Sequence, residues 1–514
     1  TDGSRDNPFE IKLPKSEGNS YFRGLKWAAD NRSLIIDRND KDTKRRQLFY
    51  IHNAGGKDEQ QILVIEETDD KWQASLSAIF EPNPKDPAQL LFCSEKDGYN
   101  HIYLATLEKN APANIPPTSG GNPTDAGYSG KVDIKPTTRG RWQVEWAKWL
   151  PGGDQIVYLV NRGPGNTSER RFVVITSNGT EVELPSVGRG GMLVSPQMDE
   201  TQQIAPVLIY SRSQWNAPDD VYSQKICLIC EGANQPRQLS ATVPESFKAL
   251  VPTIPQFVDI PSRDNKQIKA KVYLPAGHDR KKKYPMVIFV HGAGYLQNTI
   301  NGWNNYYREF MFNELLAQKG YVVLDIDYRG SAGYGREWRT DVYDFLGGKD
   351  YDDHIDAIDF MIKNYGIDAA KVGVYGGSYG GFMAEMLAFR NPEKVAAAAA
   401  LRPVADWKNY YASSPVYTAQ RLGYPDKNPE AYKRSSPISY ADGLKTHLLI
   451  LHGIVDDNVH VEDSMQLTEK LIRLGKTQYF EEQFYPAENH GFVRPESWTD
   501  EYERILTFFE RYLR

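Results

Sequence analysis

The stretch Lys371-Val-Gly-Val-Tyr-Gly-Gly-Ser-Tyr-Gly-Gly-Phe-Met-Ala-Glu-Met-Leu-Ala-Phe-Arg390 decides the fold of the second half of the chain. The apolar run Val372–Tyr375 predicts a buried strand, and Phe382–Arg390 predicts a helix with one apolar side. Ser378 lies at the apex of the glycine-rich turn between them. This is the arrangement of a nucleophile elbow, in which glycines tolerate a strained turn and close strand–helix packing. Taken alone, the stretch also fits an ordinary glycine-rich turn.

Strands and helices alternate from about residue 251 to the C-terminus. The predicted order is strands Gln256–Ile260, Ile268–Leu274 and Met286–Val290, helix Tyr306–Gln318, strand Tyr321–Asp327, helix Tyr351–Tyr365, the elbow, strands Lys394–Leu401 and Thr446–His452, helix Val461–Leu474, strand Gln478–Tyr485 and a helix from Thr499. Such alternation predicts a mostly parallel sheet with helices on both faces. Residues 251–514 are therefore expected to form an α/β-hydrolase domain.

Three strand ends in this domain carry groups for nucleophilic catalysis. Ser378 follows the elbow strand, Asp456 and Asp457 follow Thr446–His452, and His490 follows the last strand. Serine, then aspartate, then histidine is the chain order of the hydrolase fold. His490 would take the proton from Ser378, and Asp456 or Asp457 would hold the imidazole and stabilise its charged form. A loop histidine or aspartate alone is more often polar surface, so it is the combination that carries the prediction.

An oxyanion hole needs two hydrogen-bond donors aimed at the tetrahedral oxygen. The backbone N–H of Tyr379, directly after the nucleophile, is the expected first donor. The second is expected from the turn His291-Gly-Ala-Gly294, after the strand Met286–Val290, with His291 and Gly292 as candidates.

Residues 1–250 contain almost no convincing helix. A weak theme recurs instead: an aromatic or apolar strand, a turn, and an apolar strand, as in the segments from Leu25 and from Glu145. The spacing of about 45 to 70 residues is near that of four-stranded propeller blades, with a β-sandwich as the alternative. About four blades fit, fewer than closed propellers usually have. We therefore expect a propeller-type domain that is N-terminally incomplete or open.

Composition excludes several classes of protein. With 61 basic and 67 acidic residues and a net charge of −6, no basic stripe predicts a nucleic-acid partner. No apolar run reaches ~18 residues, so no membrane span is predicted. Three cysteines argue against a disulfide framework, and Cys227-x-x-Cys230 lacks the second pair of ligands that a zinc site needs. No metal cluster, dinucleotide fingerprint or phosphate loop occurs, so no cofactor is expected.

Four motifs resemble the signatures of the prolyl oligopeptidase family of serine peptidases. They are Gly376-Gly-Ser-Tyr-Gly-Gly381, Asp327-Tyr-Arg-Gly-Ser-Ala-Gly-Tyr-Gly335, His452-Gly-Ile-Val-Asp-Asp-Asn-Val-His460 and Glu488-Asn-His-Gly491. The last two are most similar to the dipeptidyl peptidase IV branch. This resemblance implies that Asp456, rather than Asp457, is the third catalytic residue and that Asn458 holds a substrate carbonyl.

The resemblance also implies a substrate pocket. Tyr417 is similar to the tyrosine that lines the proline-accepting pocket of that branch, and Trp407 and Tyr411 would be further walls, with a lid of surface aromatics as the alternative. The chain departs from the branch at Gly377, where a tryptophan is usual, and has no evident oxyanion tyrosine in His291–Tyr295. The paired glutamates that anchor a substrate amine are not recognisable in residues 1–250.

The sequence thus predicts a serine peptidase acting on short peptides, after proline or small residues, in the manner of a dipeptidyl peptidase or an oligopeptidase. An acylaminoacyl peptidase or a carboxylesterase would use the same three residues, and a non-catalytic scaffold is the third hypothesis. A peptide substrate is the expected partner, and a homodimer or larger homo-oligomer is compatible with the sequence. The compartment (periplasmic, secreted or cytoplasmic) and the exact cleavage preference are not determined.

Overall fold

The computed structural model describes residues 10–16, 18–74, 78–110, 127–162, 167–186, 191–199, 201, 205–228, 234–248, 250, 254–303 and 306–514. Contacts divide the chain into two compact units: unit 1, Thr1–Arg212, Asp219–Thr242 and Tyr334–Arg336, and unit 2, Ser213–Pro218, Val243–Gly333 and Glu337–Arg514. The domain boundary between residues 250 and 251 stays a prediction, because residues 249 and 251–253 lie outside the described part.

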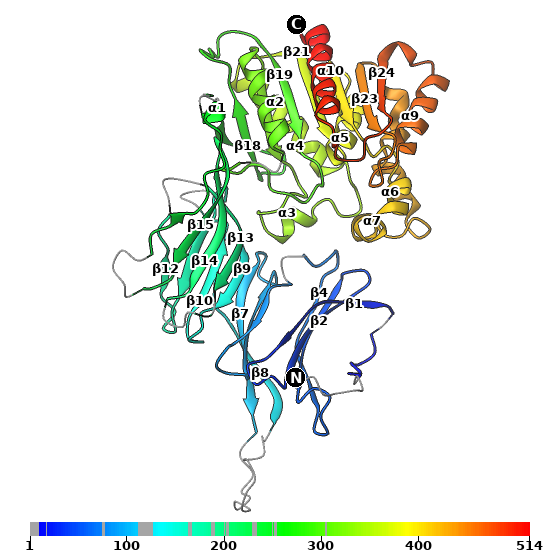
Figure 1. Ribbon diagram of the computed structural model, residues 1–514. Coiled ribbons are helices and arrows are strands. Elements are labelled where there is room, and N and C mark those ends of the chain that lie inside the picture. The colour runs from blue at the N-terminus through cyan, green and yellow to red at the C-terminus, as the bar shows by residue number, and fades with distance from the viewer. Residues whose placement is uncertain are drawn as a thin grey trace, which may run out of the picture. The chain divides into compact units, whose positions relative to one another are not determined.

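Four antiparallel four-stranded sheets form the described part of unit 1 (Figure 1). The first contains β1 (Ser20–Trp27), β2 (Leu34–Asp40), β3 (Arg45–His52) and β4 (Gln60–Thr68). The second contains β5 (Phe80–Pro82), β6 (Gln89–Ser94), β7 (His101–Lys109) and β8 (Tyr128–Pro136). The third contains β9 (Val144–Trp149), β10 (Ile156–Val160), β11 (Arg171–Ile175) and β12 (Glu181–Glu183). The fourth contains β13 (Met192–Asp199), β14 (Val207–Gln214), β15 (Ala217–Lys225) and β16 (Arg237–Gln238).

Alternate residues of one strand pack against different neighbouring sheets. In β6, Leu90 and Phe92 join a buried cluster with the first sheet, whereas Leu91 and Cys93 join a cluster with the third. A third cluster joins the third and fourth sheets through Phe172 and other residues. Because side chains alternate between the two faces of a strand, an inner sheet is apolar on both faces. Sheets stacked in this way are the arrangement expected for propeller blades.

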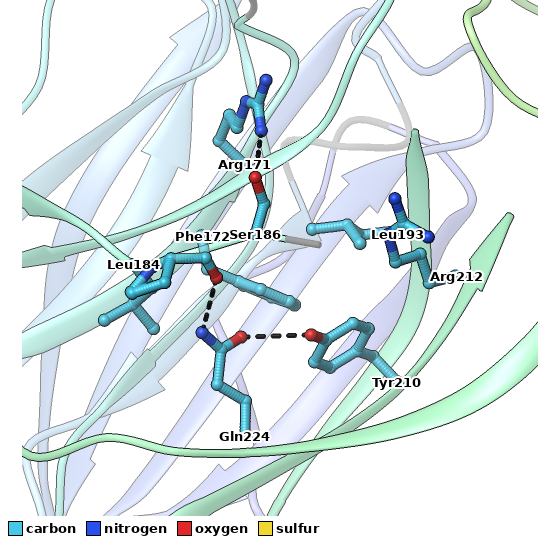
Figure 2. Close-up of a pocket in the computed structure, with 9 residues that line it drawn as sticks. Arg171, Phe172, Leu184, Ser186, Leu193, Tyr210, Arg212 and Gln224 are labelled. Atoms are coloured by element: carbon cyan, nitrogen blue, oxygen red, sulfur yellow. Dashed lines mark hydrogen bonds between the residues drawn. The ribbon is translucent and has the colours of Figure 1, made fainter. Parts of the chain in front are cut away.

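Polar groups between the third and fourth sheets are hydrogen-bonded (Figure 2). The side chain of Gln224 accepts a hydrogen bond from the Tyr210 hydroxyl (3.1 Å) and donates one to the carbonyl of Pro185 (2.7 Å). Arg171 donates to the hydroxyl of Ser186 at 2.6 Å. The pocket that these residues line is therefore part of the packing between two sheets.

The cysteines of unit 1 differ in state. Cys93 is a buried free thiol, whereas Cys227 is disulfide-bonded. This disulfide was not expected from the sequence, because three cysteines argue against a disulfide framework and the Cys227-x-x-Cys230 spacing was considered only for a zinc site. Cys230 lies outside the described residues.

One eight-stranded sheet forms the centre of unit 2, in the order β17-β18-β20-β19-β21-β22-β23-β24. The strands are β17 (Gln256–Pro261), β18 (Gln267–Tyr273), β19 (Tyr284–Val290), β20 (Val322–Asp327), β21 (Ile367–Gly377), β22 (Ala397–Leu401), β23 (His447–Gly453) and β24 (Phe480–Tyr485). β17 and β18 pair antiparallel, and the six strands from β20 to β24 pair parallel. The carboxyl ends of the parallel strands therefore meet at one edge.

Helices precede, connect and follow these strands along the chain (Figure 1). They are α1 (Glu245–Lys248), α2 (Tyr307–Gln318), α3 (Arg336–Thr340), α4 (Lys349–Asn364), α5 (Tyr379–Arg390), α6 (Trp407–Ser413), α7 (Pro415–Leu422), α8 (Pro429–Ser435), α9 (Glu462–Arg473) and α10 (Pro495–Leu513), with 3-10 turns η2 (Pro437–Gly443) and η3 (Thr477–Tyr479). Phe312 of α2 and Phe509 of α10 lie in one buried cluster with residues of the sheet, so these two helices share a face of it.

The predicted helices and strands of unit 2 are present, with shifted ends. α5 begins at Tyr379, three residues before the predicted start, because the glycines after Ser378 are helical. The short helices α1 and α3, and α6, α7 and α8 between β22 and β23, were not predicted from the sequence. In the described part of the chain, no helix is both long and apolar enough to cross a membrane.

Candidate active site

Ser378 lies at a sharp turn between β21 and α5. Its backbone has φ 60° and ψ −116°, a left-handed φ that non-glycine residues rarely adopt. Its N–H donates to the carbonyl of Leu401 and its carbonyl accepts from Phe382, both at 2.9 Å. A Cβ atom at Gly380 would lie 2.1 Å from the carbonyl oxygen of Val290, so only glycine fits this close approach. The turn therefore has the strain and the tight packing of a nucleophile elbow.

His490 and Asp456 form a hydrogen-bonded pair. Nδ1 of His490 lies 2.8 Å from Oδ2 of Asp456, which is 5% exposed. The other oxygen, Oδ1, accepts the backbone N–H groups of Asn458 and Val459, both at 2.9 Å. Because a carboxylate can only accept here, Nδ1 carries the proton and Nε2 of His490 keeps a lone pair. The pair has the geometry in which a carboxylate orients a general base.

A second histidine contacts the same carboxylate. Nε2 of His452 donates to the carbonyl of Val459 (2.9 Å) and lies 3.3 Å from Oδ2 of Asp456. Burial alone would raise the pKa of Asp456, but the hydrogen bonds from His452 and His490 hold it well below its usual value. Asp456 is therefore ionised throughout the neutral range.

The pKa of His490 is lowered. Burial is the main cause, the hydrogen bond to Asp456 opposes it, and the positive charge of Arg402 adds to the lowering. The imidazole is thus kept neutral at a pH where an ordinary histidine is partly charged. A neutral imidazole is the form that can accept a proton.

Asp457 lies apart from this pair. It is exposed, and its backbone N–H donates to Oδ1 of Asn489 at 3.1 Å. The side chain of Asp457 makes no hydrogen bond to His490, and the hydroxyl of Ser378 makes none to His490 either, within the described part of the chain. Catalytic hydrogen bonds are often long before a substrate binds, so the lack of a hydrogen bond between Ser378 and His490 does not remove Ser378 as a candidate.

Gly292 lies next to Ser378. A Cβ atom at Gly292 would be 3.7 Å from Cβ of Ser378 and 2.7 Å from the hydroxyl of Tyr306. The His291 side chain cannot turn toward this point, because its ring stacks on Tyr328 at 4.4 Å and Nε2 pairs with the hydroxyl of Ser331 at 3.0 Å. Any donor from His291 must therefore be its backbone.

Tyr306 is a residue at this site that the sequence analysis missed. Burial raises the pKa of its hydroxyl, with the negative charge of Glu309 as a further cause, so the hydroxyl stays protonated and can donate. The sequence showed Tyr306 only as the start of an expected helix, and it carries no motif that could have marked it.

An aromatic cluster surrounds the side chain that follows the nucleophile. The rings of Tyr379 and Trp407 are 5.9 Å apart, and that of Tyr417 stacks on Trp407 at 6.4 Å. Tyr410 joins them, with its ring 5.6 Å from Trp407 and its hydroxyl donating to Oδ1 of Asn458 at 3.1 Å. The structure thus brings Trp407, Tyr417 and Asn458 together through Tyr410.

Tyr411 lies elsewhere. Its ring contacts Tyr424 at 6.5 Å and Tyr432 at 6.3 Å, away from Trp407 and Tyr417. Because neighbouring residues of a helix point in different directions, only one of Tyr410 and Tyr411 can face the cluster. The sequence suggested Tyr411 as a pocket wall. The structure instead places Tyr410 next to Trp407 and Tyr417, the other two predicted walls.

Two family models match the chain. Residues 308–514 match the prolyl oligopeptidase family, and residues 2–199 match the dipeptidyl peptidase IV N-terminal region. The resemblance to the prolyl oligopeptidase family that the sequence motifs indicated is therefore confirmed for residues 308–514. The matches also confirm the predicted fold class, an α/β-hydrolase domain preceded by propeller-type sheets.

Known peptidases are similar to this chain over different lengths. Dipeptidyl peptidase 8 of Mus musculus is 26% identical over 530 residues, which cover 95% of this chain and 57% of that protein. Prolyl endopeptidase FAP of Homo sapiens is 32% identical over 228 residues, 43% of this chain and 28% of that protein. The chain therefore spans a little over half the length of the dipeptidyl peptidase.

A solved structure shows the same fold. Dipeptidyl peptidase 4 of Porphyromonas gingivalis superimposes with a TM-score of 0.79 at 24% identity, covering 98% of this chain and 65% of that one. At this level of identity the similarity concerns the fold alone.

Proposed function

We propose that this protein is a serine peptidase that cleaves short peptides through an acyl-enzyme intermediate. The observation that carries the proposal is the Asp456–His490 hydrogen bond of 2.8 Å at the same sheet edge as the strained turn of Ser378. The family and its named peptidases support the same reaction class.

The proposed reaction begins with attack of the Ser378 hydroxyl on the substrate carbonyl. Nε2 of His490 takes the hydroxyl proton and then gives it to the leaving amine, while Asp456 stabilises the imidazolium. The backbone N–H of Tyr379 and a donor beside Gly292 would stabilise the oxyanion. That second donor is a backbone N–H of the His291–Gly292 turn or the Tyr306 hydroxyl, and each such donor is worth about 10²–10³ in rate.

The proposed substrate places a proline or a small residue before the cleaved bond. Trp407, Tyr410 and Tyr417 form a set of flat apolar walls next to Tyr379, and such walls suit a compact ring better than a long or charged side chain. Asn458 would hold a substrate carbonyl from the same side.

Substrate comparison with a serine-directed label tests this proposal. A fluorophosphonate should label Ser378, and an Ala-Pro chromogenic amide should be cleaved faster than p-nitrophenyl esters relative to their spontaneous hydrolysis. Comparing free Ala-Pro with acetyl-Ala amides then separates a dipeptidyl peptidase from an acylaminoacyl peptidase. Ester cleavage with no amide cleavage would mean a carboxylesterase, and absence of labelling would leave a non-catalytic scaffold.

A further inference from the structure

Arg402 is a buried cation directly behind the proposed nucleophile. It follows the last residue of β22 and is 7% exposed, with a left-handed φ of 40°. Its backbone N–H donates to the carbonyl of Leu451 in β23 at 2.6 Å. The residue is thus fixed to the strand that precedes the Asp456 loop, and its side chain extends from there toward α10.

Three side chains of the C-terminal segment surround the guanidinium. Nη1 of Arg402 lies 3.4 Å from Oε1 of Glu501 in α10. The side chain of Glu501 is fully buried. The guanidinium carbon also lies 5.6 Å from the ring of Trp498 and 6.0 Å from that of Phe492, two residues after His490. Arg402 therefore connects α10 with the loop that carries His490.

The same guanidinium touches the residue before Ser378. A Cβ atom at Gly377 would lie 2.9 Å from Nη2, 3.1 Å from Cζ and 3.2 Å from Nε of Arg402. Three atoms of one planar group thus occupy the place where a side chain at position 377 would begin. Gly377 has no left-handed φ, so it is this contact and not the backbone that disfavours a larger residue.

The guanidinium keeps its charge in this setting. Burial lowers the pKa of Arg402, but the carboxylates of Glu501 and Glu309 outweigh it and the net direction is upward. The other titratable groups that face Arg402 are the hydroxyls of Tyr306 and Tyr502.

Both carboxyl groups are harder to ionise than usual. Burial raises the pKa of Glu501 to about 7 although Arg402 lowers it, and burial likewise raises the pKa of Glu309. Because the pKa of Glu501 is about 7, this carboxyl is partly protonated near neutral pH and then compensates the cation incompletely. The charge of Arg402 acts on His490, for which Asp456 and His452 are the other titratable groups.

We propose that Arg402 is a positioning residue for the Ser378–His490 pair: its guanidinium packs in place of a side chain at position 377, before the nucleophile, and against Phe492 in the loop that carries His490. The inference rests on the proposed function only for its effect on rate. The packing and the titration of His490 are properties of the folded protein.

The charge is tested by titrating His490 with histidine-selective NMR, assigned by loss of its signal in H490N. In R402M, we expect the midpoint to rise by about one pH unit, because a nearby cation disfavours the imidazolium. R402K should restore it to within a few tenths of a unit. The acid limb of kcat/KM should move by the same amounts.

A matched control variant distinguishes the loss of the Arg402 charge from a general loss of stability. Lys271 of β18 is another buried cation of the same sheet, paired with Asp325 at 3.1 Å and 2% exposed. K271M should lower the melting temperature without moving the His490 midpoint. If R402M does not fold, R402Q serves for the same measurement. An unmoved midpoint in the uncharged variant, or an equal shift in K271M, overturns the role of the charge.

The packing is tested by a double-mutant cycle between Gly377 and Arg402. G377A should reduce kcat at least tenfold in the wild-type background, because the added methyl displaces the guanidinium. In the R402A background the same change should cost less than threefold. If G377A lowers kcat by the same factor in the wild-type and the R402A backgrounds, the two residues do not interact and the proposed packing role is wrong.

The two proposals fail in different ways. If a fluorophosphonate does not label the wild-type protein, the proposed peptidase is contradicted. The titration of His490 still tests whether the charge of Arg402 acts on this histidine. A labelled wild type whose titration ignores residue 402 contradicts only the positioning role.

Discussion

The loops that carry Ser378, Asp456 and His490 differ from the helical segment Trp407–Gly443 in how their residues are positioned. Each loop follows a parallel strand and presents its polar residue within about five positions of the strand end. In the helical segment the residues that face the site come from α6 and α7, and they reach it by packing on residues far away in sequence. The hydroxyl of Tyr417, for example, donates to the carbonyl of Ala293 at 3.2 Å.

This difference suggests that the strand-end loops carry the proposed chemistry and that the helical segment determines substrate preference. Strand ends place catalytic groups with little freedom, since the register of the parallel sheet fixes where each strand stops. Aromatic residues on short helices depend on many ring contacts, so their orientation follows from packing. We therefore expect substitutions in the loops to abolish turnover and substitutions in the helices to change which substrate is preferred.

The largest expected effect is at Ser378. S378A should lower kcat on an Ala-Pro amide by about 10⁶, because the nucleophile is removed while the fold stays. Single-turnover assays measure the remaining activity of S378A, and a melting curve checks that the variant is still folded. Activity within tenfold of wild type in S378A would mean that another residue is the nucleophile.

The next largest effect distinguishes two neighbouring carboxylates. D456N should lower kcat by about 10⁴, because the amide would no longer select the reactive tautomer of His490. D457N should change kcat less than threefold, since Asp457 is exposed and its side chain does not contact His490. Steady-state kinetics on the two variants check this, and a larger loss in D457N would reverse the assignment.

A smaller effect is expected in the aromatic cluster. Y417A should lower kcat/KM for the Ala-Pro substrate by about 10- to 100-fold and leave a small acetyl ester nearly unaffected, because a wall of the proposed pocket is lost. Y411A is the matched variant, since Tyr411 packs on Tyr424 and Tyr432. It should lower the melting temperature and keep the preference. Equal loss of preference in both would remove the distinction between these tyrosines.

The smallest effect is a displacement of the pH profile. Protonated His490 cannot accept the proton of Ser378, so kcat/KM should fall as the pH drops through the pKa of His490. Because that pKa is lowered, the midpoint of the acid limb should lie below the ordinary value of ~6.5. Rate measurements between pH 4 and pH 9 check this, and a midpoint above 7 would contradict the electrostatics of the site.

The sequence predicted the features that depend on residues close together along the chain. The strand, turn and helix around Ser378 are present as expected, and the matched family models support the fold class. The residues alone left Asp456 and Asp457 open, and only the resemblance favoured Asp456. A dyad of adjacent aspartates has no periodicity that could tell which one faces inward.

Tertiary structure decided the contacts between segments distant in sequence. Helix docking decides that Tyr410 rather than Tyr411 faces Trp407 and that the Tyr306 hydroxyl reaches Gly292. The pairing of β21 with β22 decides that Arg402 packs against Gly377. Local pattern determines which residues form a strand, a turn or a helix. The neighbours of a side chain are set by long-range packing, for which a single sequence carries no periodic signal.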